Sequence, residues 1–201
     1  MHGTTDQQDL TARDLAARWW RPALAVLAVA AAVAWRLTKD DLGAPPNLEL
    51  ATAASFLAAG VLRHRLAALA PLAVAAVSDL LLGNSAVLWF TWSAWAVIGL
   101  GAMLTRRARG GRRFAAAVGL GVGGSVFFFL WTNAGVWVQG RGAYYPAGLD
   151  GLAASYAAGL PFLRNMLLGN LVLLPAAAAA VALVERLEGP GERASVPGAA
   201  R

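Results

Sequence analysis

The sequence contains no cysteine, which excludes disulfides, thiolate metal sites and cysteine nucleophiles. Charged residues are also scarce, at 14% of the 201 residues, whereas 58% are hydrophobic. This balance lies outside the range of ordinary soluble domains, and it predicts an all-α integral membrane protein. We therefore expect a lipid bilayer around most of the chain.

The chain has little that indicates an enzyme or a nucleic-acid binder. Its net charge of +6 comes from arginines placed between apolar runs, not along one amphipathic face with stacking aromatics. An intramembrane enzyme usually needs paired carboxylates or histidines at helix-turn spacing, and Asp79 and His64 are too few for such chemistry. We expect no nucleic-acid partner, no catalytic residue, no metal and no cofactor.

Apolar runs predict a bundle of six transmembrane helices. The runs cover about 22–37, 48–62, 66–83, 86–104, 114–138 and 160–184. The second run is short and rich in alanine, so it is either a tilted span or half of a re-entrant pair with the third. These runs place a transmembrane domain at residues 22–187.

The two ends of the chain are predicted to lie outside that domain. Residues 1–21 read as a cytoplasmic leader with a short interfacial helix capped at Thr11, after which Pro22 starts the first span. Residues 188–201 are rich in Gly, Pro and charge, which predicts a disordered cytoplasmic tail.

Lysine and arginine are distributed asymmetrically between the two sides of the predicted bundle. The side that holds both termini receives thirteen: Arg13, Arg18, Arg21, Arg63, Arg65, Arg106, Arg107, Arg109, Arg112, Arg113, Arg186, Arg193 and Arg201. The other side receives four: Arg36, Lys39, Arg141 and Arg164. Because positive loops stay in the cytoplasm, this count predicts six spans with both termini inside.

Polar residues gather at the predicted outer ends of the spans. These residues are Asn47, Ser78, Asp79, Asn133, Arg164 and Asn165. Polar groups at membrane depth are costly, so their convergence predicts an external cavity for a small-molecule substrate. Arg164 either pairs with Asp79 or reaches the interface alone, in which case Asp79 caps a helix end.

Aromatic residues supply the predicted apolar walls of this cavity. They are Trp137, Tyr145 and Tyr156, while Trp89, Trp92 and Trp95 are either further lining or membrane-interface aromatics. The loop at 144–161 has the pattern of a short helix that lies over the cavity as a lid, and Pro161 is expected to start the sixth span.

Small residues predict close helix contacts. Ala28 with Ala32 and Ala30 with Ala34 are small pairs at four-residue spacing, which suit packing against a helix of this chain or of a partner. The stretch GLGVGGS at 119–125 lacks the preceding strand of a dinucleotide loop, so it reads as a smooth helix face.

Five blocks of the sequence carry a resemblance to a known family. The blocks are PPN at 45–47, SD at 78–79, TNAGVW at 132–137, YYP at 144–146 and GLAASYAAGLPFLRNMLLGN at 151–170. Together they resemble an uncharacterised bacterial family described as transport proteins. In size and six-span layout that family is similar to the substrate-binding S components of energy-coupling factor (ECF) vitamin transporters.

The resemblance implies a six-helix bundle in the bacterial cytoplasmic (inner) membrane. It also implies an external substrate cavity and an alanine-rich first helix that faces a transmembrane coupling subunit with ATPases. The leading hypothesis is therefore the substrate-binding component for uptake of a vitamin-like small molecule or metal complex. Two alternatives stay open: a structural or assembly subunit of a membrane complex, and an intramembrane lipid-modifying enzyme.

Overall fold

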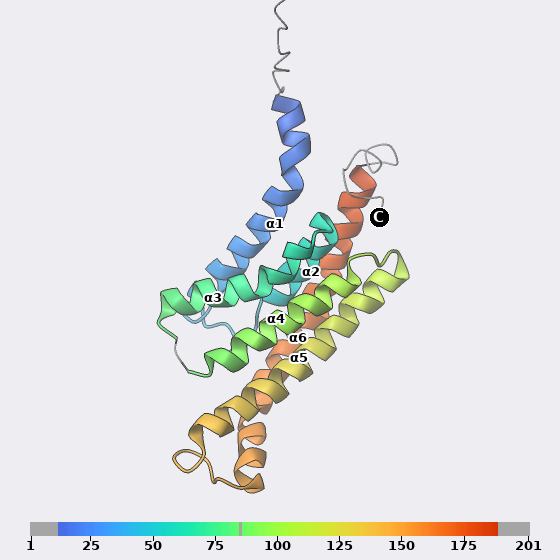
Figure 1. Cartoon of the computed structure of the whole chain (residues 1–201). Helices are drawn as coiled ribbons and strands as arrows, with labels where there is room; N and C mark the ends of the chain where they lie inside the picture. The colour runs from blue at the N-terminus through green and yellow to red at the C-terminus, as the bar shows by residue number, and fades with distance from the viewer. Residues whose placement is uncertain (1–11, 85, 189–201) are drawn as a thin grey trace, which may run out of the picture.

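A computed structural model describes residues 12–84 and 86–188, with side chains from Trp19 onward. Within these residues the chain is helical, and its only strand-like pairing is a single bridge between Arg141 and Tyr145. The elements are α1 (Ala12–Thr38), α2 (Ala51–Leu62), the 3-10 helix η1 (Arg65–Leu69), α3 (Ala70–Leu82), α4 (Leu88–Thr105), α5 (Gly111–Gly140) and α6 (Leu149–Leu187), arranged as in Figure 1. The prediction of an all-helical protein is confirmed.

Five segments of the described chain are long and apolar enough to cross a membrane, one fewer than predicted. They are Trp19–Thr38, Arg65–Leu82, Leu88–Thr105, Gly111–Gly140 and Leu149–Leu187. The exception is α2, whose 12 residues span about 18 Å against a hydrocarbon core of about 30 Å.

The short helix α2 is apolar around its whole circumference and is enclosed by its neighbours. It packs against α1, α3, α4 and α6, and its buried alanines belong to two of the apolar clusters that form the core. A helix without a polar face is stable only where protein or lipid covers every side. α2 therefore forms the centre of the bundle.

Two helices begin earlier than the prolines in the sequence suggest. Pro22 lies inside α1 and Pro161 lies inside α6, so neither starts a span. The predicted short interfacial helix is instead the first part of α1, as far as residues 12–21 are described. Proline suits the first turn, but a helix interior in lipid also tolerates it. Residues 1–11 and 189–201, most of the predicted leader and tail, lie outside the described residues.

The predicted lid is also absorbed into α6, which lies along α5 from its first turns. Ser155 Oγ donates a hydrogen bond to the carbonyl of Asn133 at 2.8 Å, and Tyr156 Oη donates to the carbonyl of Leu130 at 3.2 Å. Figure 1 shows that this end of the α5–α6 hairpin extends past α3 and α4. The segment therefore braces α5 and does not cover a cavity as predicted.

At the opposite end, ion pairs join helix ends that are far apart in sequence. Arg63 after α2 and Arg113 in α5 each donate to Glu185 in α6, both at 2.6 Å. Arg21 in α1 pairs with Glu188 just beyond α6. The start of α5 and the ends of α2 and α6 thus meet, as the predicted alternation of helix directions requires.

Glu185→Gln tests whether this cluster holds the helix ends together. The substitution removes the counter-charge of Arg113, which is only 4% exposed, and we expect the free energy of unfolding to fall by about 2 kcal/mol. Thermal unfolding in detergent measures the change. Arg186→Gln removes an exposed charge from the neighbouring position and is expected to have little effect. Equal melting temperatures for the two variants would contradict this role of Glu185.

Candidate solute pocket

Four charged residues meet where α1 and α3 end and α2 is about to begin. Arg36 NH2 donates to Asp79 Oδ1 at 2.9 Å, and Arg36 NH1 donates to Glu49 Oε1 at 3.1 Å. Lys39 Nζ donates to the same oxygen of Glu49, also at 3.1 Å. We call Arg36, Lys39, Glu49 and Asp79 the ion-pair network. It contains two cations and two carboxylates, so its formal charges cancel.

Asp79 has a partner for each carboxylate oxygen. Besides Arg36, Asn84 Nδ2 donates to Oδ1 at 3.1 Å and Trp92 Nε1 donates to Oδ2 at 3.0 Å. Gly83 brings Asn84 back toward Asp79. It follows the last residue of α3 with φ 69°, and the backbone N–H of Asn84 then donates to the backbone carbonyl of Asp79. This turn is typical of glycine after a helix end. Asp79 is thereby fixed between α1, α3 and α4.

Ser78 also holds the guanidinium of Arg36 in place. Arg36 Nε donates to Ser78 Oγ at 2.6 Å, and this hydroxyl in turn donates to the backbone carbonyls one turn back in α3. Three nitrogens of the guanidinium therefore each have a fixed partner. Such a fork of donors holds an arginine in one orientation more firmly than a single ion pair does.

Glu49 differs from Asp79 because one of its oxygens has no partner. The residue is 6% exposed, and its Oε2 atom is buried without a hydrogen bond to any residue in the described part of the chain. A buried carboxylate oxygen left unpaired costs free energy, so native structures usually supply a donor. Oε2 is enclosed by protein atoms, so Glu49 takes part in the network through Oε1, which accepts from Arg36 and Lys39.

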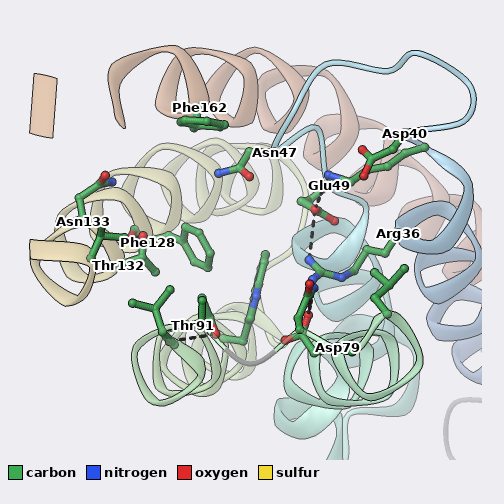
Figure 2. Close-up of a pocket in the computed structure, with 18 residues that line it drawn as sticks. Arg36, Asp40, Asn47, Glu49, Asp79, Thr91, Phe128, Thr132, Asn133 and Phe162 are labelled. Atoms are coloured by element: carbon green, nitrogen blue, oxygen red, sulfur yellow. Dashed lines mark hydrogen bonds and ion pairs between the residues drawn. The ribbon is translucent and has the colours of Figure 1, made fainter. Parts of the chain in front are cut away.

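The ion-pair network forms one side of a cavity of about 750 Å³. Figure 2 shows Arg36, Glu49 and Asp79 on one side, with Phe128 and Asn133 of α5 facing them. The polar lining residues are Arg36, Lys39, Asp40, Asn47, Glu49, Asp79, Asn84, Thr91, Thr132 and Asn133. The aromatic ones are Trp95, Phe128 and Phe162. The pocket thus joins a charged side to an aromatic side, within the size range of small-molecule sites.

Aromatic packing fixes the second side of the pocket. Trp95 in α4 is 1% exposed, and its ring centroid lies 4.9 Å from that of Phe128 in α5. This is a favourable distance for a tilted aromatic pair. Phe162 in α6 is half-exposed at the pocket and provides a more accessible apolar surface.

Four of the nine residues predicted to bind substrate belong to the pocket or its support. Asn47, Asp79 and Asn133 line it, and Ser78 holds Arg36. Asn47 adopts φ 59°, a left-handed conformation that asparagine tolerates better than most residues. Asn133 donates through Nδ2 to the carbonyl of Phe129, and its amide packs against Gly159 of α6.

The other five predicted residues are not part of the pocket lining. Trp137 donates to the carbonyl of Pro146, and Tyr156 contacts α5, so both brace the hairpin. Tyr145 lies in the hairpin turn, where its carbonyl accepts from Gly142. Asn165 and Arg164 also lie outside the pocket lining.

Of the two alternatives left open for Arg164, the pairing with Asp79 is wrong. Asp79 pairs with Arg36, while Arg164 is exposed and has no ion pair within residues 12–84 and 86–188. The reason is that α6 packs along α5, whereas α1, which carries Arg36, packs beside α3. Asn165, the next residue, donates to the carbonyl of Pro46 at 3.0 Å and so anchors the loop before α2.

Sequence reasoning missed Arg36, Lys39 and Glu49 as site residues. A signal existed for the first two, since they are half of the four cations that depart from the positive-inside pattern. Glu49 lies within the second apolar run, where a carboxylate is costly unless it is paired. Trp92 and Trp95 belong to the site, whereas Trp89 is 83% exposed and suits the membrane-interface interpretation.

The pocket side chains can bind a molecule through hydrogen bonds, charge pairing and aromatic contact. In the part of the chain that the structure describes, no group of three or more His, Asp or Glu side chains is placed to hold a metal ion. The pocket side chains are instead fixed by one another, which is the arrangement of a preformed binding site.

The fold and the pocket together define an all-helical, multi-pass membrane protein with a charged cavity at one end of its bundle. The chain belongs to a family of unknown function, DUF6580, whose profile matches residues 15–190. No curated protein and no solved structure matches the chain. The membership agrees with the predicted uncharacterised family, while the similarity to ECF S components stays a prediction.

Proposed function

We propose that this protein is a membrane transport protein, the substrate-binding component for uptake of a vitamin-like small molecule or metal complex. The observation that carries the proposal is the ion-pair network, which lies in the lining of a cavity instead of being sealed in the core. Charged groups within a membrane bundle are costly and usually mark a substrate pathway. In this proposal the pocket faces outward and both termini are cytoplasmic.

A purely structural role explains the pocket less well. A helix clamp needs only a buried pair, yet this network is flanked by Asn47, Thr132 and Asn133 around open volume. Groups that only join helices have no need of a cavity of this size. Residues from α1, α3, α4, α5, α6 and the loop before α2 all contribute, as expected for a site between helices of a bundle.

A coupling partner fits one face of α1. Ala28 and Ala32 pack inward, so this small pair serves the internal core. Ala30 and Ala34 are exposed, together with Val26. We propose that the second pair is where a transmembrane coupling subunit with ATPases docks, because small residues let helices approach closely in lipid.

Saturable binding tests the transport proposal, with Phe162→Ala as the pocket variant. The purified protein in nanodiscs is offered a broad vitamin panel, and native mass spectrometry detects any retained molecule. We expect one compound to bind and Phe162→Ala to weaken it about tenfold through loss of an apolar wall. Phe114→Ala is the matched control, since the two side chains are 43% and 42% exposed and Phe114 lies outside the pocket.

The outcomes separate the transport proposal from a structural role. No binding from the whole panel, together with obligate co-purification of another membrane subunit, would favour a structural subunit. Equal weakening by Phe162→Ala and Phe114→Ala would place the binding site elsewhere.

A further inference from the structure

Resting on the proposed function, we infer that the solute taken by this pocket carries no net charge. It bears a flat apolar ring, and its polar edge offers both hydrogen-bond donors and acceptors. Three features of the pocket point to this class of solute: the balance of its charges, its unused hydrogen-bond donors and acceptors, and the position of its aromatic side chains.

The charges of the pocket are already balanced. Arg36 and Lys39 are matched by Glu49 and Asp79, and the four side chains are between 6% and 15% exposed. A charged solute would add an unmatched charge beside these largely buried side chains, or would displace a member of the network and leave its partner unpaired. Asp40 also lines the cavity, but it is exposed, so water screens its charge. Electroneutrality therefore favours an uncharged solute.

The network nevertheless leaves donors and acceptors unused. Lys39 Nζ makes one of its three possible hydrogen bonds with the described residues. The Asn47 side chain lines the cavity and has no hydrogen bond within the described chain, so its amide offers both a donor and an acceptor. A solute with an amide-like edge, N–H beside C=O, satisfies both sets.

The aromatic side chains define the other half of the solute. Phe128 and Phe162 lie across the cavity from Glu49 and Asp79 (Figure 2), and Trp95 packs against Phe128. Apolar and aromatic walls bind flat rings through buried area and offset stacking. A ring that points toward Phe128 and Phe162 places its polar edge against the network.

Matched charge series test the inference on wild-type protein in nanodiscs. The first series shares a pyridine ring: nicotinamide is uncharged, nicotinate is an anion and 1-methylnicotinamide is a cation. The second shares a benzene ring: benzamide, benzoate and benzamidinium. Dissociation constants are measured by calorimetry at pH 7. We expect the uncharged member of each series to bind about tenfold more tightly than either charged member.

Lys39→Met then shifts the charge balance by one unit. Methionine keeps much of the apolar stem, while Arg36 keeps its bonds to Ser78, Glu49 and Asp79. With one carboxylate now in excess, the cationic member should gain about tenfold relative to the uncharged one. Asp40→Asn removes an exposed charge at the same pocket and should change this preference less than twofold.

Each result bears on the inference separately from the proposed function. Tightest binding of the anion or the cation by wild-type protein would overturn the neutral class while leaving solute binding in place. A preference that Lys39→Met does not move would overturn the charge-balance argument. Failure of all six compounds would also overturn the inference, and the proposed function would fall only if the broad vitamin panel failed too.

Discussion

Arg36→Met is expected to destabilise the protein by about 3–5 kcal/mol, one of the two largest effects of any single substitution considered. The substitution leaves the carboxylates of Asp79 and Glu49 facing each other without the guanidinium that joins them. Lys39 still compensates Glu49, but Asp79 retains only its hydrogen bonds from Asn84 and Trp92. Thermal or denaturant unfolding in mild detergent measures the loss.

The effect of Arg36→Met has two controls. Arg164→Met removes an exposed arginine without an ion pair in the described chain, and its unfolding free energy should change by less than about 0.5 kcal/mol. The double variant Arg36→Met with Asp79→Asn should be less destabilised than the sum of its single variants, because no unpaired carboxylate is left at Asp79. A larger loss in Arg164→Met than in Arg36→Met would restore the pairing predicted from the sequence and contradict the structure.

Gly99→Ala is expected to disrupt packing between α4 and η1 just as severely. A Cβ added at Gly99 would lie 1.9 Å from the backbone carbonyl oxygen of Ala68 and 2.9 Å from its carbonyl carbon. Backbone cannot rotate away as a side chain can, so the two helices must separate. We expect a loss of several kcal/mol and, where expression is retained, a lower melting temperature in detergent.

A second glycine serves as the control for Gly99→Ala. Gly123 lies in α5, within the stretch predicted to form a smooth helix face, and a Cβ there would meet nothing within 4 Å. Because alanine favours the helix over glycine by about 1 kcal/mol, Gly123→Ala should leave stability unchanged or raise it slightly. Destabilisation by both variants to a similar extent would contradict the role of close backbone approach at Gly99, because an added Cβ meets nothing within 4 Å at Gly123.

The general arrangement of the bundle could be predicted from the sequence better than the contacts between its helices. Apolar runs located six helices, and the charge asymmetry predicted which ends meet, as the contacts of Arg63 and Arg113 with Glu185 confirm. The polar end of the bundle was also located correctly, because Asn47, Asp79 and Asn133 share one cavity. Periodicity and charge counts report on single helices and their directions, which explains this success.

Periodicity and charge counts could not predict which arginine pairs with Asp79. Arg36 and Arg164 both lie at the polar end, and only the arrangement of neighbouring helices decides between them. In the structure α1 packs beside α3, whereas α6 packs along α5, so Arg36 reaches Asp79 and Arg164 does not. Contacts between helices distant in sequence depend on packing of the whole bundle, and one sequence does not specify that order by inspection.

The length of α2 has a consequence for how the protein is made. A segment of 12 apolar residues is too short for the bilayer alone to hold across its thickness, so insertion machinery has no stable transmembrane state in which to release it. Its alanines and Phe56 pack against α1, η1, α3, α4, α5 and α6, and most of these elements leave the ribosome after α2. The centre of the molecule is thus completed last, once the C-terminal half has been synthesised and can close around it.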